Sequence, residues 1–244
     1  MEEKNPFEGI KTYDSYKHVW QLTAFVLFMQ VLTYLLASLA AHFFGVELDP
    51  FEAIIPAFIL TAYISWTVLA GLGVAWRPAW ADWQANAGRD VLKAFKYLAG
   101  YAGVLLAMGG VLLAGYYFLG DRLAEVMKPV SAANASQDLS VETLSGSSFR
   151  FLLLLLSSCV VAPVVEELFF RRIIFTTLRL KRGFWFSAFW SGLLFAVFHG
   201  GAALVTLPVG IYLAWVYERE RRLPVNIFLH GMVNFLAVLY KTFG

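Results

Sequence analysis

Long apolar runs separated by short polar stretches dominate the sequence. A helix needs about 20 apolar residues to cross the hydrocarbon core of a bilayer. Seven runs reach or approach that length, although the fifth and sixth are short. The pattern therefore predicts an all-α protein, a polytopic transmembrane helical bundle of about seven spans. The predicted spans are residues 19–44, 51–75, 97–119, 149–170, 184–198, 202–217 and 223–240.

Composition supports a membrane protein. Hydrophobic residues make up 59% of the 244 residues and charged residues only 15%, whereas soluble domains have about 45–50% apolar and about 25% charged residues. So little polar surface excludes a soluble enzyme, a disordered tail and a nucleic-acid-binding protein. The net charge of +2 indicates no particular partner, and the single cysteine, Cys159, excludes an intrachain disulfide.

The distribution of basic residues predicts the orientation. The polar segment 1–17 precedes an apolar run that is too long for a signal peptide, so residues 19–44 are expected to stay as a span. Short cytoplasmic loops are enriched in Lys and Arg. With the N-terminus in the cytoplasm, the opposite side holds only Arg122, Lys128, Arg150 and Lys241 of the 19 basic residues. We therefore expect an integral, multi-pass protein, in the plasma membrane if the source is prokaryotic, with its N-terminus cytoplasmic and its C-terminus outside.

An acidic pair interrupts the fourth apolar run. Glu166 and Glu167 lie between apolar residues on both sides, although each acidic side chain at the bilayer centre costs about 2.5–3.5 kcal/mol. Glu167 and Arg171 are four residues apart, so they share a helix face and can form an ion pair. Glu166 points about 100° away and stays free to act. Pro163 is expected to kink the helix just before the pair.

Two histidines lie in later apolar runs. Glu166 and His199 are each about 25 Å of helix from the basic boundary at Arg182, so they are expected at similar depth. His230 and Asn234 are four residues apart and share a face. A single histidine of this kind is more often a core residue bonded to a backbone carbonyl. Three polar faces in one half of the chain, however, predict a shared internal polar cavity, because polar groups inside membranes mark function.

Three motifs follow one another on these apolar helices: Glu166-Glu167-x-x-x-Arg171, Phe195-x-x-x-His199 and His230-x-x-x-Asn234. Together they resemble the signature motifs of the CAAX protease and bacteriocin-processing family of intramembrane endopeptidases, also called the Abi or type II CAAX prenyl endopeptidase family. The resemblance covers about residues 149–240. It implies a helical bundle with a conical cavity open to the cytoplasm and the membrane. It also implies cleavage near the C-terminus of a membrane-attached or hydrophobic peptide or protein.

The resemblance also suggests how the chain is organised. Residues 1–148 are expected to be a variable N-terminal membrane scaffold of three spans plus an outer loop, and residues 149–244 the catalytic membrane core. The outer loop 120–148 is expected to hold a short amphipathic helix. The inner loop 76–96 carries three tryptophans of the kind found at membrane interfaces.

The residue types in the motifs suit peptide hydrolysis. Glu166 is the candidate general base, with His199 holding the attacking water. His230 and Asn234 are candidate donors to the developing oxyanion, where one donor contributes about 2.7–4 kcal/mol. Glu167 and Arg171 are expected to orient the pair. The predicted catalytic residues are thus Glu166, Glu167, Arg171, His199, His230 and Asn234.

Other readings of the same residues stay open. A zinc-dependent site would use Glu166, His199 and His230 as ligands. Because the pattern H-E-x-x-H is absent, we favour a mechanism without a cofactor. The expected partners are a membrane-attached peptide or protein substrate and the lipid bilayer, with no nucleic acid. The alternative functions are a non-catalytic membrane immunity or scaffold protein and, less favoured, a proton-coupled transporter, since intramembrane Glu and His also serve proton relays.

Overall fold

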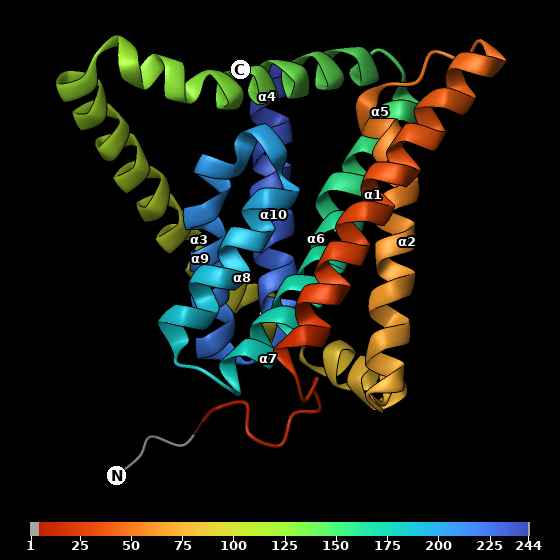
Figure 1. Cartoon of the computed structure of the whole chain (residues 1–244), viewed down its shortest axis with the longest axis vertical. Coiled ribbons are helices and arrows are strands. Elements are labelled where there is room, and N and C mark those ends of the chain that lie inside the picture. The colour runs from red at the N-terminus through yellow and green to blue at the C-terminus, as the bar shows by residue number, and fades with distance from the viewer. Residues whose placement is uncertain (1–4, 244) are drawn as a thin grey trace.

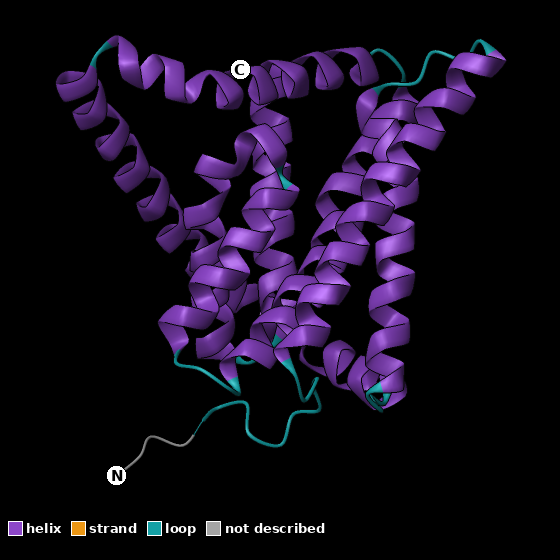
Figure 2. Cartoon of the chain, in the orientation of Figure 1, coloured by secondary structure: helices purple, strands orange, loops and turns teal. Residues whose placement is uncertain are grey.

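The computed structural model describes residues 5–243, and every regular element in that range is a helix (Figure 2). The elements in chain order are α1 (Tyr16–Phe44), α2 (Pro50–Gly71), α3 (Trp76–Leu119), α4 (Asp121–Ser145), α5 (Ser148–Leu156), the π-helix η1 (Ser157–Val161), α6 (Ala162–Glu166), the π-helix η2 (Glu167–Phe175), α7 (Thr176–Arg179), α8 (Phe184–Phe198), the 3₁₀-helix η3 (Gly200–Ala202), α9 (Ala203–Glu220) and α10 (Leu223–Phe243).

Six helical segments of the described range are long and apolar enough to cross a membrane. They are α1, α2, α3, the continuous rod from α5 to α7, the segment from η3 to α9, and α10. The seventh predicted span is α8, which has 15 residues and is about 22 Å long. The prediction of an all-α, multi-pass bundle is confirmed, and the count of seven spans becomes six long helices and one short one.

Local signals explain where the first helices begin and end. The Ser15 side chain accepts a hydrogen bond from the Lys17 amide at the start of α1, and α1 ends at Gly45, whose φ is +66°. At the start of α2, Asp49 and Glu52 form a capping box. The Asp49 side chain accepts a hydrogen bond from the Glu52 backbone amide, and the Glu52 side chain accepts one from the Asp49 backbone amide. Arg150 at the start of α5 binds the Glu52 carboxylate with distances of 2.8 and 2.7 Å. This bond ties the start of the α5–α7 rod to the start of α2.

Two segments expected as loops are helical. The segment 76–96 forms the first half of α3, a helix of 44 residues. Its only proline, Pro78, lies in the first turn, where proline is tolerated. The segment 120–148 contains α4, a helix of 25 residues, so the expected short helix is a long one. Figure 1 shows α4 lying across the upper ends of the other helices, between the end of α3 and the start of α5.

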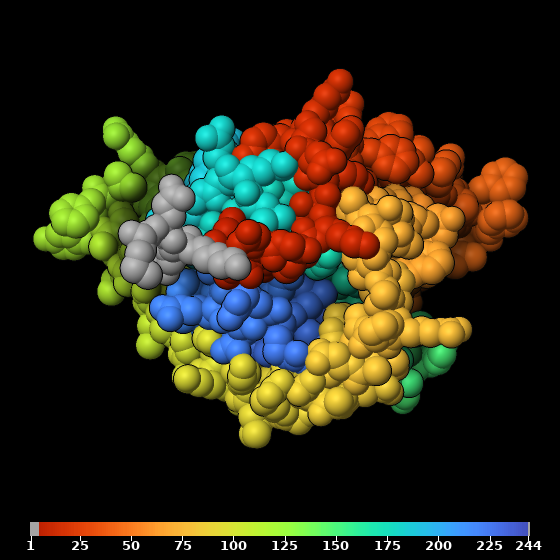
Figure 3. Space-filling view, turned by 90° about the horizontal axis from the view of Figure 1, so that it is seen from below, coloured from red at the N-terminus to blue at the C-terminus, as the bar shows by residue number. Residues whose placement is uncertain are grey.

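The N-terminal segment packs against the opposite side of the bundle. Phe7 is fully buried, with its ring 5.7 Å from that of Phe175 and 5.4 Å from that of Tyr217. Asn5 donates a hydrogen bond to the Arg179 carbonyl at 2.8 Å. Figure 3, which looks at this side, shows the segment lying across the ends of the later helices.

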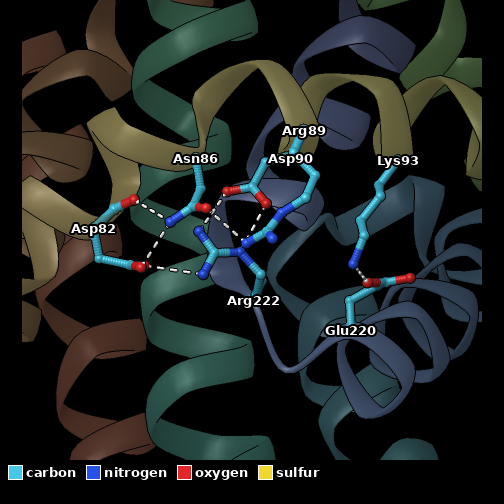
Figure 4. A network of polar contacts seen from close by, with 7 residues as sticks. All are labelled: Asp82, Asn86, Arg89, Asp90, Lys93, Glu220 and Arg222. Carbon is cyan, nitrogen blue, oxygen red and sulfur yellow. Dashed lines mark hydrogen bonds and ion pairs between the residues drawn. The ribbon is translucent and has the colours of Figure 1, made fainter.

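A polar network on the same side fixes the turn between α9 and α10 (Figure 4). Arg222 binds both carboxylate oxygens of the buried Asp90 at 2.7 Å, and it binds Asp82 at 2.9 Å. The hydrogen bond to Asp90 raises the pKa of Arg222 above its ordinary value. Lys93 forms an ion pair with Glu220 at the end of α9. Both interactions join α3 to the turn from which α10 starts.

Glycines allow the helices of the core to touch. A Cβ at Gly210 of α9 would lie 2.9 Å from the Gly192 Cα of α8, and one at Gly231 of α10 would lie 2.5 Å from the Cys159 carbonyl oxygen. Such contacts require residues without a side chain. Gly192, Gly210 and Gly231 are therefore packing positions.

Candidate active site

The acidic pair lies at a junction between two kinds of helix. The α-helix α6 ends at Glu166, and the nine-residue π-helix η2 begins at Glu167. Such π-helical segments are rare and are frequent at functional sites. The change of helical geometry between the two residues turns their side chains toward different neighbours.

The irregularity expected at Pro163 takes the form of the π-helical turn η1 directly before it. Proline has no amide hydrogen, so it cannot donate to the Cys159 carbonyl four residues earlier. Helix α10 contacts the rod at this point. Asn234 donates a hydrogen bond to the Ser158 carbonyl at 2.7 Å, and Gly231 faces the Cys159 carbonyl. Backbone groups released from the regular helix therefore position α10.

Glu167 is fully buried and binds three side chains. Its Oε1 lies 3.0 Å from His230 Nδ1. Its Oε2 lies 3.1 Å from Arg171 Nε, as an ion pair, and accepts a hydrogen bond from Asn226 at 3.2 Å. The Arg171 guanidinium also lies over the Phe195 ring, 4.9 Å from its centroid. The Glu167 carboxylate thus joins η2 to α10, and Arg171 extends the network to α8.

Glu166 faces both histidines. Its Oε2 lies 3.9 Å from His199 Nε2 and 3.7 Å from His230 Nε2. Within residues 5–243, this buried oxygen has no hydrogen-bond partner. The separations exceed a direct hydrogen bond but suit a single bridging water. The structure therefore brings the three predicted side chains together around one point.

The other nitrogen of each histidine determines its tautomer. His230 Nδ1 faces a carboxylate, and His199 Nδ1 lies 2.7 Å from the Phe195 carbonyl oxygen. Carbonyl and carboxylate oxygens accept hydrogen bonds, so each Nδ1 carries a hydrogen. In the neutral state, both Nε2 atoms then turn a lone pair toward Glu166. His199 occupies the last position of α8, directly before Gly200, whose φ is +55°.

Two adjoining cavities share Glu166 and His199 in their walls. One has a volume of about 230 Å³ and the other about 400 Å³. The larger cavity is also lined by Asn234 and extends to Lys241 at the end of α10 and to Gln137 of α4. Both cavities thus extend toward α4, away from the side of the N-terminal segment. With the N-terminus in the cytoplasm, they do not face the cytoplasmic opening that the resemblance implies.

Several residues of this site were not predicted from the sequence. Asn226 lies four residues before His230, so its helical spacing was a usable signal. Gln30 and Thr61 line the smaller cavity from α1 and α2, and Gln137 lines both cavities from α4. A lone Gln in an apolar run carries little information by itself. These three residues belong to the part of the chain that was interpreted as a scaffold.

The donor types at Glu166, His199 and His230 match those that zinc prefers. Across residues 5–243, however, no three His, Cys, Asp or Glu side chains are arranged to hold a metal ion. The absence of a cofactor stays a prediction.

Fold and site together define a multi-pass membrane protein with a glutamate and two histidines inside a helical bundle. Residues 148–236 match the family described as "Type II CAAX prenyl endopeptidase Rce1-like". This segment of the chain is therefore similar to the CAAX protease and bacteriocin-processing family, which is a family of proteases.

A bacterial relative covers the same part of the chain. The protein named "Putative membrane peptidase YdiL" of Bacillus subtilis (strain 168) is 35% identical over 91 residues. The aligned region is 36% of this chain and 37% of that protein, so the chain spans little more than a third of the relative's length. No solved structure matches the chain. The division of the chain at residues 148 and 149 stays a prediction.

Proposed function

We propose that this protein is an intramembrane endopeptidase that hydrolyses a peptide bond of a membrane-attached or hydrophobic peptide or protein. The observation that carries the proposal is the convergence of Glu166 Oε2 with the Nε2 atoms of His199 and His230 at 3.9 and 3.7 Å. One carboxylate oxygen and two imidazole nitrogens around one point in a bundle suit a bound water molecule. The family match and the name of the bacterial relative support the same class of reaction.

In the proposed mechanism, Glu166 is the general base. A water between Glu166 and His199 donates one hydrogen to the carboxylate and one to His199 Nε2. Its oxygen attacks the scissile carbonyl while Glu166 takes the proton. When the carbon–nitrogen bond breaks, Glu166 returns that proton to the leaving amine. Atoms balance, since one water is consumed and a new carboxyl and a new amine are formed.

The proposed oxyanion donors are His230 and Asn234. Because His230 Nδ1 binds the Glu167 carboxylate, His230 can donate from Nε2 only as an imidazolium, which the buried Glu167 stabilises. One amide hydrogen of Asn234 is used by the Ser158 carbonyl, and the second is left for the substrate. Arg171 and Asn226 hold Glu167 in the orientation that this role requires.

The test is a comparison of peptide termini in membranes that contain the wild-type protein or Glu166→Gln. This substitution keeps the size of the side chain and removes the base. We expect a set of wild-type termini to be lost in Glu166→Gln and kept in Glu142→Gln, which changes an exposed acid on α4. Identical termini in all three membranes would overturn the proposal. A cellular effect that survives Glu166→Gln would favour a scaffold or immunity role.

We also propose that the N-terminus is cytoplasmic, and that the membrane is the plasma membrane if the source is prokaryotic. The support is the excess of Lys and Arg on the side of the N-terminal segment. In a Cys159→Ser background, we expect an impermeant thiol reagent added from outside to label Glu142→Cys and to spare Lys17→Cys, both at exposed positions. Labelling of Lys17→Cys alone would reverse the orientation.

A further inference from the structure

The wall opposite Glu166 and His199 comes from outside the segment that matches the family. The smaller cavity is bounded on that side by Gln30 of α1 and by Phe58 and Thr61 of α2, whereas the family match begins at residue 148. Gln30 is a polar side chain in the middle of an apolar helix. It therefore brings a hydrogen-bonding group into the cavity that holds the proposed base.

The hydrogen bonds of Thr61 orient the Gln30 amide. The Thr61 hydroxyl donates its only hydrogen to the Ala57 carbonyl at 2.8 Å. It can therefore only accept from Gln30, whose Nε2 lies 3.0 Å away. This places the nitrogen of the amide toward α2 and leaves its oxygen, Oε1, as an acceptor. Within residues 5–243, this oxygen is not among the buried polar atoms that lack a hydrogen-bond partner. It can therefore accept a hydrogen bond from a molecule in the cavity.

Apart from Gln30, Thr61, Gln137, Glu166 and His199, the lining of this small cavity is apolar. Its walls include the rings of Phe58, Phe169 and Phe198. A volume of about 230 Å³ lies below the roughly 300–1,000 Å³ of cavities that hold whole small ligands. It suits one bulky apolar side chain and the backbone amide beside it, as part of a longer chain that continues into the larger cavity.

We propose that Gln30 is a substrate-binding residue whose Oε1 accepts a backbone N–H of the substrate next to the scissile bond. The substrate class is then an extended peptide with a bulky apolar side chain in the smaller cavity. Thr61 is the positioning residue that turns Oε1 toward the substrate. This inference rests on the proposed peptidase function. It gives α1 and α2, which lie outside the segment that matches the family, a part in substrate binding.

A purely structural role for Gln30 predicts something different. A hydrogen bond between two membrane helices can simply hold them together. In that case, Gln30→Leu would lower the stability of the protein and its activity on every substrate alike. If Gln30 contacts the substrate, Gln30→Leu would instead change how the cleavage rate depends on one particular amide of the peptide. The assay therefore has to replace the amides one at a time.

The experiment uses the full chain in two stages. In the first stage, peptide termini that are present in membranes with the wild type and absent with Glu166→Gln give the sequence at the cleavage site. A synthetic peptide of that sequence is then assayed in phosphatidylcholine vesicles, alongside analogues in which one amide at a time is replaced by an ester. The variants are Gln30→Leu and Thr61→Val. Their matched controls are Gln21→Leu and Thr67→Val, the same changes at exposed positions of α1 and α2.

For the wild type, we expect one ester position near the cut to lower kcat/KM by about 3- to 10-fold, as for a lost neutral hydrogen bond. Gln30→Leu should lose the same factor on the all-amide peptide and show no further loss with that ester. Thr61→Val should move in the same direction, and the two controls should behave as wild type.

Two results would overturn the inference while leaving the peptidase function standing. One is an ester profile of Gln30→Leu that equals that of wild type. The other is a uniform loss across all analogues together with lower thermal stability, which would assign Gln30 to helix packing. The absence of any terminus that depends on Glu166 would overturn the proposed function itself, and this inference with it.

Discussion

The contact at Gly231 gives a quantitative test of how the site is assembled. In Gly231→Ala, the new Cβ would lie 2.5 Å from the Cys159 carbonyl oxygen, and ordinary contact begins at 3.4 Å, so α10 and the rod must separate by about 0.9 Å. Overpacking of this kind costs about 1–3 kcal/mol. Alanine is also better than glycine within a helix by about 0.8–1.0 kcal/mol. The net expectation is a loss of about 0–2 kcal/mol in the free energy of unfolding.

The matched control is Gly103→Ala, because a Cβ there meets no atom within 4 Å. It should gain the helical preference without the clash, so the two variants should differ by about 1–3 kcal/mol. Unfolding in mixed micelles by titration with SDS measures this difference without reference to activity. His230 and Asn234 flank Gly231 on α10, and a misplacement of about 1 Å can cost about 10²-fold in rate. Equal stability of the two variants and full cleavage by Gly231→Ala would refute the packing argument.

Three further predictions concern buried charges and metal. Glu167→Gln leaves Arg171 charged and buried, so we expect it to unfold more easily by about 3–5 kcal/mol; unchanged SDS unfolding would contradict the network around Glu167. Arg222→Gln strands the buried Asp90 and should cost about 3 kcal/mol, whereas Asp82→Asn, at a half-exposed partner, should cost less than about 1 kcal/mol. Incubation with a chelator should leave cleavage unchanged, and inactivation that zinc reverses would contradict the metal-free mechanism.

Much of the fold was predictable because hydropathy is a property of the chain itself. A run of apolar residues has to leave water wherever its neighbours lie, and in a membrane only a helix satisfies its backbone. The two errors, at 76–96 and 120–148, have one origin. Both segments are polar enough to lie outside the hydrocarbon, and polarity alone does not separate a surface helix from a loop.

Part of the candidate site was predictable in its residues, and none of its contacts between helices was. Glu166, Glu167, Arg171, His199, His230 and Asn234 were expected from charge, helical spacing and the family motifs. Spacing along one helix correctly indicated the Glu167–Arg171 pair. It could not show that His230 would bind Glu167 through one nitrogen and face Glu166 with the other, since those residues lie on different helices.

The amino-acid sequence by itself determined the apolar helices, the membrane setting and the side chains able to do acid–base chemistry, because each depends on residues near one another in the chain. The tertiary structure decided which faces meet. The close approach at Gly231 and the cavity wall at Gln30 both arise from packing between distant segments. Side-chain contacts across helices depend on their relative position and rotation, and no local pattern of hydropathy encodes these.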